Sequence, residues 1–180
     1  ESDIQALKKK VDTVVVKLHW GIHFIPKEIA DYQPVVAKAA FNAGADLIIG
    51  HHAHTPKAIG VFDKKVCFFS VSNFIMSSPE KTPEAAAKFE KSYRVKLDPD
   101  YPRLPYGSDG KRSMVVKATL GEGGAKKVAF LPTLIDPQLR PEILKAGDER
   151  FDDIVQFMEW VSDEFPHNFT VEGDEVVITG

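Results

Sequence analysis

The feature that most constrains the fold is a repeated pattern of short apolar strands in the first seventy residues. Asp12 to Leu18 contains three consecutive valines, as strands covered on both faces do. Asp46 to Ile49 and Lys65 to Phe69 are two further runs of strand length. We therefore expect a largely parallel sheet, with the first strand buried on both of its faces.

A helix is expected between the first two of these strands. Pro34 suits the first turn of a helix, and Gly44 is a good stop signal after its last turn. The helical spacing predicts an apolar stripe formed by Val35, Val36, Ala39 and Ala40. Strand, helix and strand together form a βαβ unit, which places the chain in the α/β class.

The remaining chain adds a helical segment at residues 3–10, two hairpins and a long helix. Met114 to Leu120 and Lys127 to Leu131 are expected to pair across a glycine-rich turn, and residues 169–171 and 176–178 across Gly173-Asp174. Asp148 to Phe165 has the period of an amphipathic helix, with Asp148 as its N-cap.

Composition narrows the function classes. A length of 180 residues favours one domain, and the net charge of −3 argues against a nucleic-acid partner, which requires a basic face. No apolar run approaches the roughly 18 residues of a membrane helix. The one cysteine, Cys67, lies in an apolar run and is interpreted as a core residue.

Residues 77–112 differ from the rest of the chain. They contain five prolines and many charged residues, with few aliphatic ones and one short helical stretch from Pro83 to Lys91. A segment of this length without much regular structure is typically a lid or binding loop. We expect a surface excursion or lid here.

Five of the six histidines fall just after the first two predicted strands. His19 and His23 follow the first strand, and His51, His52 and His54 follow the second. Ligand sites in open α/β sheets form outside the carboxyl ends of strands, and neutral imidazole is the commonest metal-ligating side chain. We interpret His19, His52 and His54 as metal ligands.

Each histidine also has a simpler interpretation. A single histidine after a strand is usually a capping or surface residue, and it is the coincidence of two clusters that favours a metal site. His51 and His23 are candidates for roles in catalysis or substrate contact, while His167 is expected at the surface.

The third predicted strand is followed by Ser70-Val71-Ser72-Asn73-Phe74. Ser70 and Asn73 are candidates for orienting the metal ligands by hydrogen bonds from outside the coordination shell. The alternative is a turn stabilised by its own serine and asparagine side chains, which spacing alone favours.

Three segments in order resemble the bacterial capsule-synthesis, poly-γ-glutamate-synthesis protein family (CapA-like). They are Leu18-His19-Trp20-Gly21, residues 43–54 ending in Gly50-His51-His52-Ala53-His54, and Phe69 to Phe74. The resemblance is clear over residues 3–76 and weaker from Met114 to about Glu164. That family belongs to the calcineurin-like metallophosphoesterase superfamily, so the resemblance implies a four-layer α/β/β/α sandwich with two divalent metal ions at the strand ends.

The resemblance also assigns roles. It implies that His19 is the family's His-Trp-Gly histidine and that His52 and His54 are its His-x-His pair. Two positions depart from the family pattern: His23 stands where glutamate is usual, and Ser72 where glycine is usual. The exchange at His23 replaces an anionic group by a neutral or cationic one.

In the family, the first metal ligands come from an N-terminal half with a Gly-Asp motif. No residue before His19 supplies such ligands here, so we expect residues 1–180 to be the C-terminal part of a single metallophosphoesterase-like domain. The expected partner is the missing N-terminal half, in the same chain or as a separate one. Family members are often exported or membrane-anchored, and this chain shows no signal-peptide pattern.

The leading hypothesis is a metal-dependent hydrolase. Two cations, of Mn, Zn or Fe, would activate a hydroxide for attack on a phosphoester or amide-type bond, with His51 or His23 acting on the leaving group. The substrate would be a small molecule or an anionic polymer. The alternative is a non-catalytic module that binds an anionic capsule polymer along basic residues of the excursion, namely Lys81, Lys88, Lys91, Arg94, Lys96, Arg103, Lys111 and Arg112.

Overall fold

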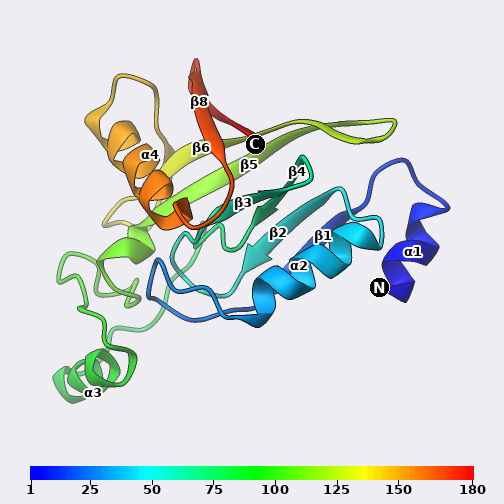
Figure 1. Cartoon of the computed structure of the whole chain (residues 1–180). Coiled ribbons are helices and arrows are strands. Elements are labelled where there is room, and N and C mark those ends of the chain that lie inside the picture. The colour runs from blue at the N-terminus through cyan, green and yellow to red at the C-terminus, as the bar shows by residue number, and fades with distance from the viewer.

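The computed structural model describes residues 1–180 as two β-sheets and four α-helices (Figure 1). None of the helices has the length and apolarity needed to cross a membrane. The first sheet has the order β1-β2-β4-β3. Its strands are β1 (Val15–His19), β2 (Leu47–His51), β3 (Ile59–Phe62) and β4 (Lys65–Phe68).

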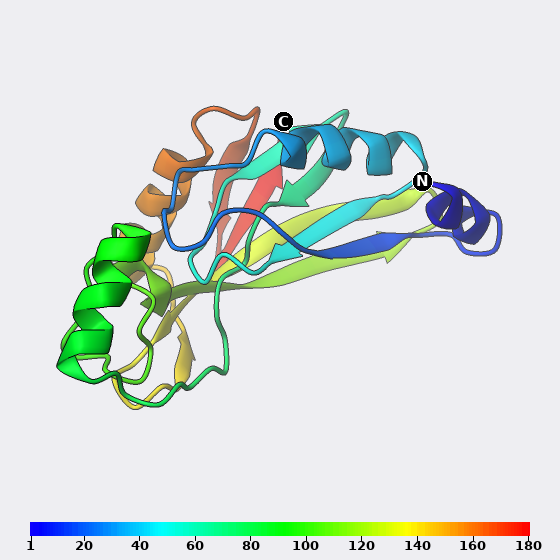
Figure 2. The ribbon, with the colours of Figure 1, turned by 90° about the horizontal axis from the view of Figure 1, so that it is seen from below.

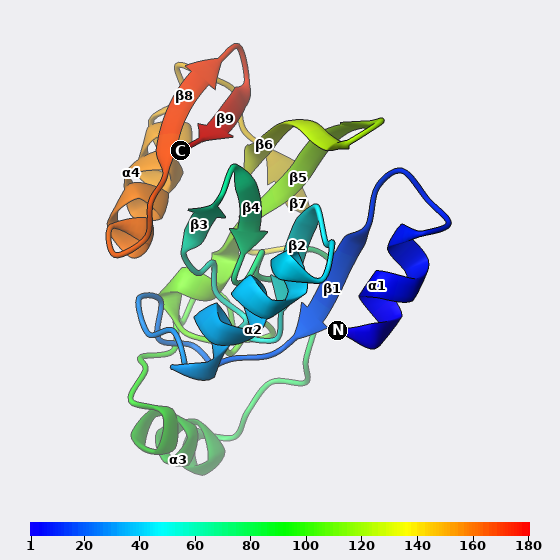
Figure 3. The same cartoon turned by 45° about the vertical axis from the view of Figure 1, so that its right-hand side comes forward.

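In this sheet β1, β2 and β4 are parallel, and β3 runs antiparallel to β4. The βαβ unit is completed by α2 (Tyr32–Asn42), which lies against one face of the sheet (Figures 2 and 3). The parallel arrangement brings the ends of β1, β2 and β4 to one edge of the sheet.

The second sheet is antiparallel and contains both predicted hairpins. Its order is β5-β6-β9-β8, and β7 pairs with β6. Its strands are β5 (Arg112–Gly121), β6 (Gly124–Ile135), β7 (Pro141–Ile143), β8 (Asn168–Glu172) and β9 (Glu175–Thr179). The predicted hairpins are confirmed, with longer strands than the sequence indicated.

The other helices are α1 (Ser2–Lys8), α3 (Pro83–Tyr93) and α4 (Glu149–Ser162), with a short 3-10 helix at Ser108–Lys111. Asp148 is the N-cap of α4, because its side chain accepts a hydrogen bond of 2.9 Å from the backbone N–H of Arg150. The predicted cap and helix are therefore confirmed.

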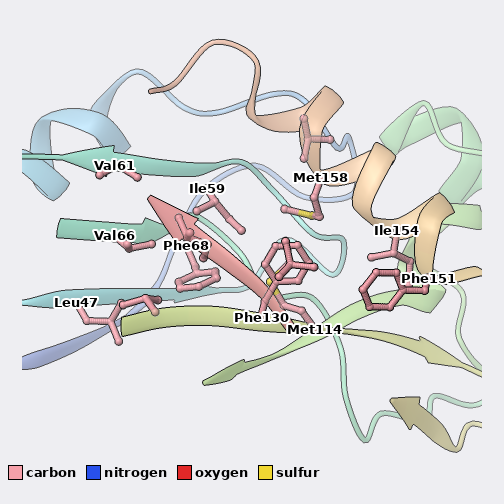
Figure 4. Close-up of a cluster of buried hydrophobic side chains, with 14 of the residues drawn as sticks. Leu47, Ile59, Val61, Val66, Phe68, Met114, Phe130, Phe151, Ile154 and Met158 are labelled. Carbon is pink, nitrogen blue, oxygen red and sulfur yellow. The ribbon is translucent and has the colours of Figure 1, made fainter. Parts of the chain in front are cut away.

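The largest core lies between the two sheets. Phe68 of β4 and Phe130 of β6 are fully buried there, and α4 adds Phe151, Ile154 and Met158 to the same cluster (Figure 4). A second core fills the space between α2 and the other face of the first sheet and includes the fully buried Cys67. The predicted α/β sandwich is confirmed, with α4 sharing the core between the sheets.

Two details of the predicted packing are wrong. β1 is an edge strand whose Val15 is 38% exposed, because β2 is its only neighbour. On α2, Val35 and Val36 are exposed, and the buried face is Gln33, Ala37, Ala40 and Phe41. That face has the i, i+4, i+7, i+8 spacing of a helix, and its two alanines allow close approach to the sheet.

Residues 77–112 lie at the side of the molecule toward which β1 and β2 run (Figure 2). Their one α-helix, α3, has no buried residue. The segment is nevertheless attached to the body, because Tyr101 and Leu104 form a small core with Ile135 of β6. The Tyr101 hydroxyl donates a hydrogen bond of 3.0 Å to the carbonyl of Ile135.

Gly50 in β2 is required by close packing. Trp20 lies next to it, stacks on Phe69 and donates from its indole Nε1 to the Phe69 carbonyl at 3.0 Å. A Cβ on residue 50 would overlap that carbonyl oxygen and lie 2.5 Å from Trp20 Nε1. The segment after β1 is therefore locked to the end of β4 across a glycine.

We predict that Gly50→Ala destabilises the protein by about 1–3 kcal/mol, the usual range for an overpacked core. The physical reason is the displacement of Trp20 from its bond to Phe69. Urea unfolding followed by Trp fluorescence measures this. Gly121→Ala is the comparison variant, since Gly121 lies outside the positive-φ region and a Cβ there would make only ordinary contacts, at 3.5 Å or more, with the Lys126 side chain. Equal stability of Gly50→Ala and wild type would contradict the packing argument.

Candidate metal centre

The five clustered histidines come together because β1 and β2 are parallel and in register. His19 is the last residue of β1, and it pairs directly with His51, the last residue of β2. Paired residues of neighbouring parallel strands project to the same face of a sheet. Leu47 and Ile49 of β2 pack into the core between the sheets, so His51 and His19 project to that same side.

His19 and His52 are in direct contact. The Nε2 atom of His19 lies 2.7 Å from the Nδ1 atom of His52, with the ring centroids 4.5 Å apart. The backbone makes this possible at a cost: His52 has φ 100° and His54 has φ 57°, values that residues with a Cβ rarely adopt. Such outliers cluster at functional sites, where the surrounding structure maintains them.

His54 is held by Asn73. The His54 Nδ1 atom lies 2.7 Å from Asn73 Oδ1, while Asn73 Nδ2 donates to the carbonyls of His54 at 3.1 Å and Gly110 at 2.9 Å. These two donations identify Oδ1 as the acceptor, so Nδ1 of His54 carries the proton. The free lone pair is then on Nε2, which is the arrangement of a metal-ligating histidine with an outer hydrogen bond.

Ser70 has a different position from Asn73. Its side chain is 1% exposed, and its hydroxyl accepts a hydrogen bond of 3.2 Å from the backbone N–H of Ser72. Ser72 adopts φ 71°, the region that favours glycine. Ser70 therefore contacts the turn, and no hydrogen bond joins it to a histidine.

His23 joins the cluster from the loop after β1. Its ring centroid lies 3.9 Å from that of His52 and 6.2 Å from that of His54. The backbone N–H of the next residue, Phe24, donates to the carbonyl of Ala53 at 2.8 Å, which holds this loop against the His52–His54 segment. Four imidazoles, those of His19, His23, His52 and His54, thus form one group.

Burial favours the neutral form of several of these rings. It is the main cause that lowers the pKa of His23, His51 and His52. For His23 and His52 the neighbouring histidines lower the pKa further, and for His51 the next cause is the positive charge of Lys17. Neutral rings retain the lone pairs that bind metal ions.

The four imidazoles are chemically suitable ligands for a divalent ion, but they supply only part of a coordination shell. Imidazole nitrogens are good ligands for zinc, iron and manganese. Among the described residues, however, no group of three or more His, Cys, Asp or Glu side chains is arranged to hold a metal ion. No carboxylate accompanies the four imidazoles, so further ligands would have to come from outside these residues.

A cavity of about 430 Å³ opens beside the histidines, at the β1 side of the space between the sheets. Its lining includes Ser113 and Met114 of β5 and the apolar side chains of Phe74, Ile75 and Met76. The Nε2 atom of His51, which also lines this cavity, is buried without a hydrogen-bond partner.

Several residues that contact the site were not predicted from the sequence. Tyr106 stacks on His54 with centroids 4.1 Å apart, and Gly110 accepts from Asn73. Ser113 donates to the carbonyl of Asn73. All three lie 33 to 40 positions beyond Asn73, in or next to the 77–112 excursion, and no local sequence pattern links them to the histidines.

Lys57 was also missed, and it fixes the loop that carries His23. Its side chain is only 2% exposed, and its ammonium donates to the carbonyls of Ile25 and, at 2.8 Å, Glu28. Burial lowers the pKa of Lys57 to about 8, although the nearby Glu28 opposes this shift. Burying an ammonium group costs free energy even when two carbonyls accept its hydrogen bonds. This cost indicates that the position of the loop that carries His23 is important to the protein.

Comparison with known proteins points to one family. Residues 1–78 match the family described as bacterial capsule synthesis protein PGA_cap. The PGA biosynthesis protein CapA of Bacillus subtilis (strain 168) is 42% identical over 72 residues, which are 40% of this chain and 19% of that protein. The capsule biosynthesis protein CapA of Bacillus anthracis is 40% identical over 68 residues, which are 38% of this chain and 16% of that protein.

A more distant relative is the uncharacterized protein y4sH of Sinorhizobium fredii (strain NBRC 101917 / NGR234), 30% identical over 64 residues, 36% of this chain and 14% of that protein. The chain therefore matches less than a fifth of the length of these curated relatives. The resemblance to the CapA-like family is confirmed over residues 1–78, which include all five clustered histidines.

We predict that Lys57 makes stability depend on pH above neutrality. Because its pKa in the folded state is about 8, below its unfolded value of 10.5, the unfolded chain binds more protons between these pH values. The free energy of unfolding should therefore rise with pH through this window, and below pH 8 this gain is absent.

Urea unfolding of wild type and Lys57→Met at pH 7.5 and pH 9.5 tests this. The stability of wild type relative to the variant should increase at the higher pH. Lys126→Met, an exposed lysine on β6, controls for the change in net charge. If the free energy of unfolding of wild type differs from that of Lys57→Met by the same amount at both pH values, burial does not lower the pKa of Lys57.

Proposed function

We propose that this chain contributes His19, His52 and His54 to the divalent-metal centre of a hydrolase that acts in the synthesis of a capsule polymer. The contact of 2.7 Å between His19 and His52, made across the ends of two parallel strands, is the observation that carries the proposal. The family match over residues 1–78 and the names of the two CapA relatives support the link to capsule synthesis.

The site's chemistry supports hydrolysis. Two divalent ions, as the resemblance to the CapA-like family implies, would lower the pKa of a water molecule and polarise a phosphoester or amide-type bond. In this chain Asn73 would keep the His54 Nε2 lone pair directed at the ion, and His19 and His52 would bind through the nitrogens that now face each other.

His51 and His23 are suited to proton transfer. His51 lines the cavity, and its Nε2 atom is buried without a hydrogen-bond partner, so a bond from a substrate group to this atom would satisfy it. The lowered pKa of each ring favours the neutral form, which accepts a proton. We assign the proton transfer at the leaving group to His51, which lines the cavity, or to His23: the neutral ring would first accept a proton from the attacking water and then donate that proton to the leaving group.

The remaining ligands are proposed to come from an N-terminal half of the same domain, in the same chain or as a separate one. The basis is the donor set: four imidazoles without a carboxylate are an incomplete site for two cations. The exposed edge of β1 is compatible with such a partner, because its backbone is paired only with β2.

A non-catalytic polymer-binding module is the weaker alternative. Of the eight basic residues in the 77–112 excursion, Arg94, Lys96, Lys111 and Arg112 form ion pairs with acidic side chains. Half of the suggested basic track is therefore neutralised within the chain, which disfavours an extended polyanion along it.

We predict that His52→Ala/His54→Ala greatly reduces the metal bound by the protein, because it removes two of the three proposed ligands. Mass-spectrometric analysis of bound Mn, Zn and Fe in purified protein measures this. His167→Ala is the matched control, since His167 bonds to Glu159 and the Phe165 carbonyl, away from the cluster. Unchanged metal content in the double variant would refute the metal role.

The orientation of His54 offers a second test. Asn73→Leu removes the acceptor for His54 Nδ1, and we expect metal affinity to fall about 10- to 100-fold, as for other outer partners of metal-ligating histidines. Asn73→Asp retains an acceptor and should keep most of the affinity, although both variants lose the bond to Gly110. Competition with a chromophoric chelator measures the affinities. Equal affinities of Asn73→Leu and Asn73→Asp would show that Asn73 does not act through His54.

A further inference from the structure

The cavity beside the histidines has an unusual charge distribution. Lys17 is its one lining residue with a permanent charge, and no aspartate or glutamate lines it. The four histidines in its wall are His19, His51, His52 and His54. The chain as a whole carries a net charge of −3, so a cavity without any carboxylate is a local exception.

Lys17 belongs to the same strand face as His19. The two residues are two positions apart on β1, which places them on one side of the sheet and about 7 Å apart along the strand. Lys17 pairs with Ile49 just as His19 pairs with His51, so its side chain also leaves the sheet toward the space between the layers. Its ammonium therefore borders the cavity beside the proposed ligands.

Lys17 has no hydrogen-bond or ion-pair partner in the chain. Lys117 and Lys127, which are also strand lysines, pair with Glu175 and Glu172. The Lys17 side chain is exposed. A free ammonium in an acid-free cavity favours an anionic oxygen group.

The apolar residues that line the cavity indicate the rest of the ligand. Phe74 is 43% exposed and Ile75 is 82% exposed, and both line the cavity with Met76 and Val71. Large apolar side chains exposed next to a cavity are suited to hydrocarbon contact. A ligand that contacts both the Lys17 ammonium and these apolar side chains carries its anionic group on a short aliphatic arm.

We propose that Lys17 is a specificity residue that binds an anionic oxygen group, borne on an aliphatic arm, in the substrate of the histidine site. The inference rests on the proposed function for the identity of that site as the reaction centre. It adds the residue that selects the substrate's charge, at a fixed separation of two strand positions from His19.

The test uses three probes with the purified protein in calorimetric titrations. A trimer of γ-linked glutamate carries carboxylates on aliphatic arms, its fully amidated counterpart has the same arms without charge, and glycerol 3-phosphate presents a phosphate. We expect the trimer or the phosphate to bind and the amidated trimer to bind at least tenfold more weakly. The better of the two anions identifies the source of the anionic group.

Lys17→Met keeps the aliphatic stem and removes the charge. Loss of a hydrogen bond to a charged group should weaken binding of the anionic probe roughly 10- to 100-fold. Lys17→Arg should retain most of the affinity, and Lys126→Met, which changes net charge equally, should bind as wild type does. Circular dichroism of each variant confirms that it is folded.

Three results would overturn the inference: no binding of either anionic probe by wild type, equal affinity for the charged and amidated trimers, or equal affinity of wild type and Lys17→Met. Metal content is measured on the same samples and separates the two proposals. A protein that binds metal but no anion refutes the role of Lys17 alone. A protein that binds the anion through Lys17 but no metal refutes the metal centre and leaves the role of Lys17 intact.

Discussion

The parallel, in-register pairing of β1 with β2 is the constraint on which the rest of the site depends. It sets His19 opposite His51, and it directs both side chains into the space between the two sheets. An antiparallel pair would have put the two strand ends at opposite edges of the sheet. The crossover through α2 is what allows parallel pairing, so a helix that contributes no side chain to the cavity still determines where the histidines meet.

The space between the two sheets holds both the main hydrophobic core and the cavity beside the histidines. Over β2, β3 and β4 it is filled by the main hydrophobic core, which α4 closes (Figure 4). Beside β1, the edge strand of the first sheet, a cavity remains open and is lined by the histidines and by apolar side chains. The rigid core therefore forms one wall of the cavity, and the site needs no separate scaffold.

Much of the fold was predictable from the sequence, because the valine, isoleucine and phenylalanine runs that become β1, β2 and β4 are strong local signals. β3 was missed, since Gly60 interrupts its apolar run, and β7 has only three residues. The clustering of the histidines was also predictable, because they follow the ends of two strands that were expected to be parallel. The roles of Tyr106, Gly110 and Lys57 were not predictable, because each depends on where a distant loop folds back, and single-sequence patterns carry no information on such contacts.

Asn73 connects two parts of the chain that are far apart in sequence. One amide group orients the His54 ring through its oxygen and holds the carbonyl of Gly110, in the turn that ends the 77–112 excursion, through its nitrogen. The two equilibria are consequently linked: whatever stabilises His54 in this orientation also stabilises that turn, and by the same free energy in each direction. The orientation of the His54 ring and the conformation of the turn at Gly110 are thus coupled through a single side chain.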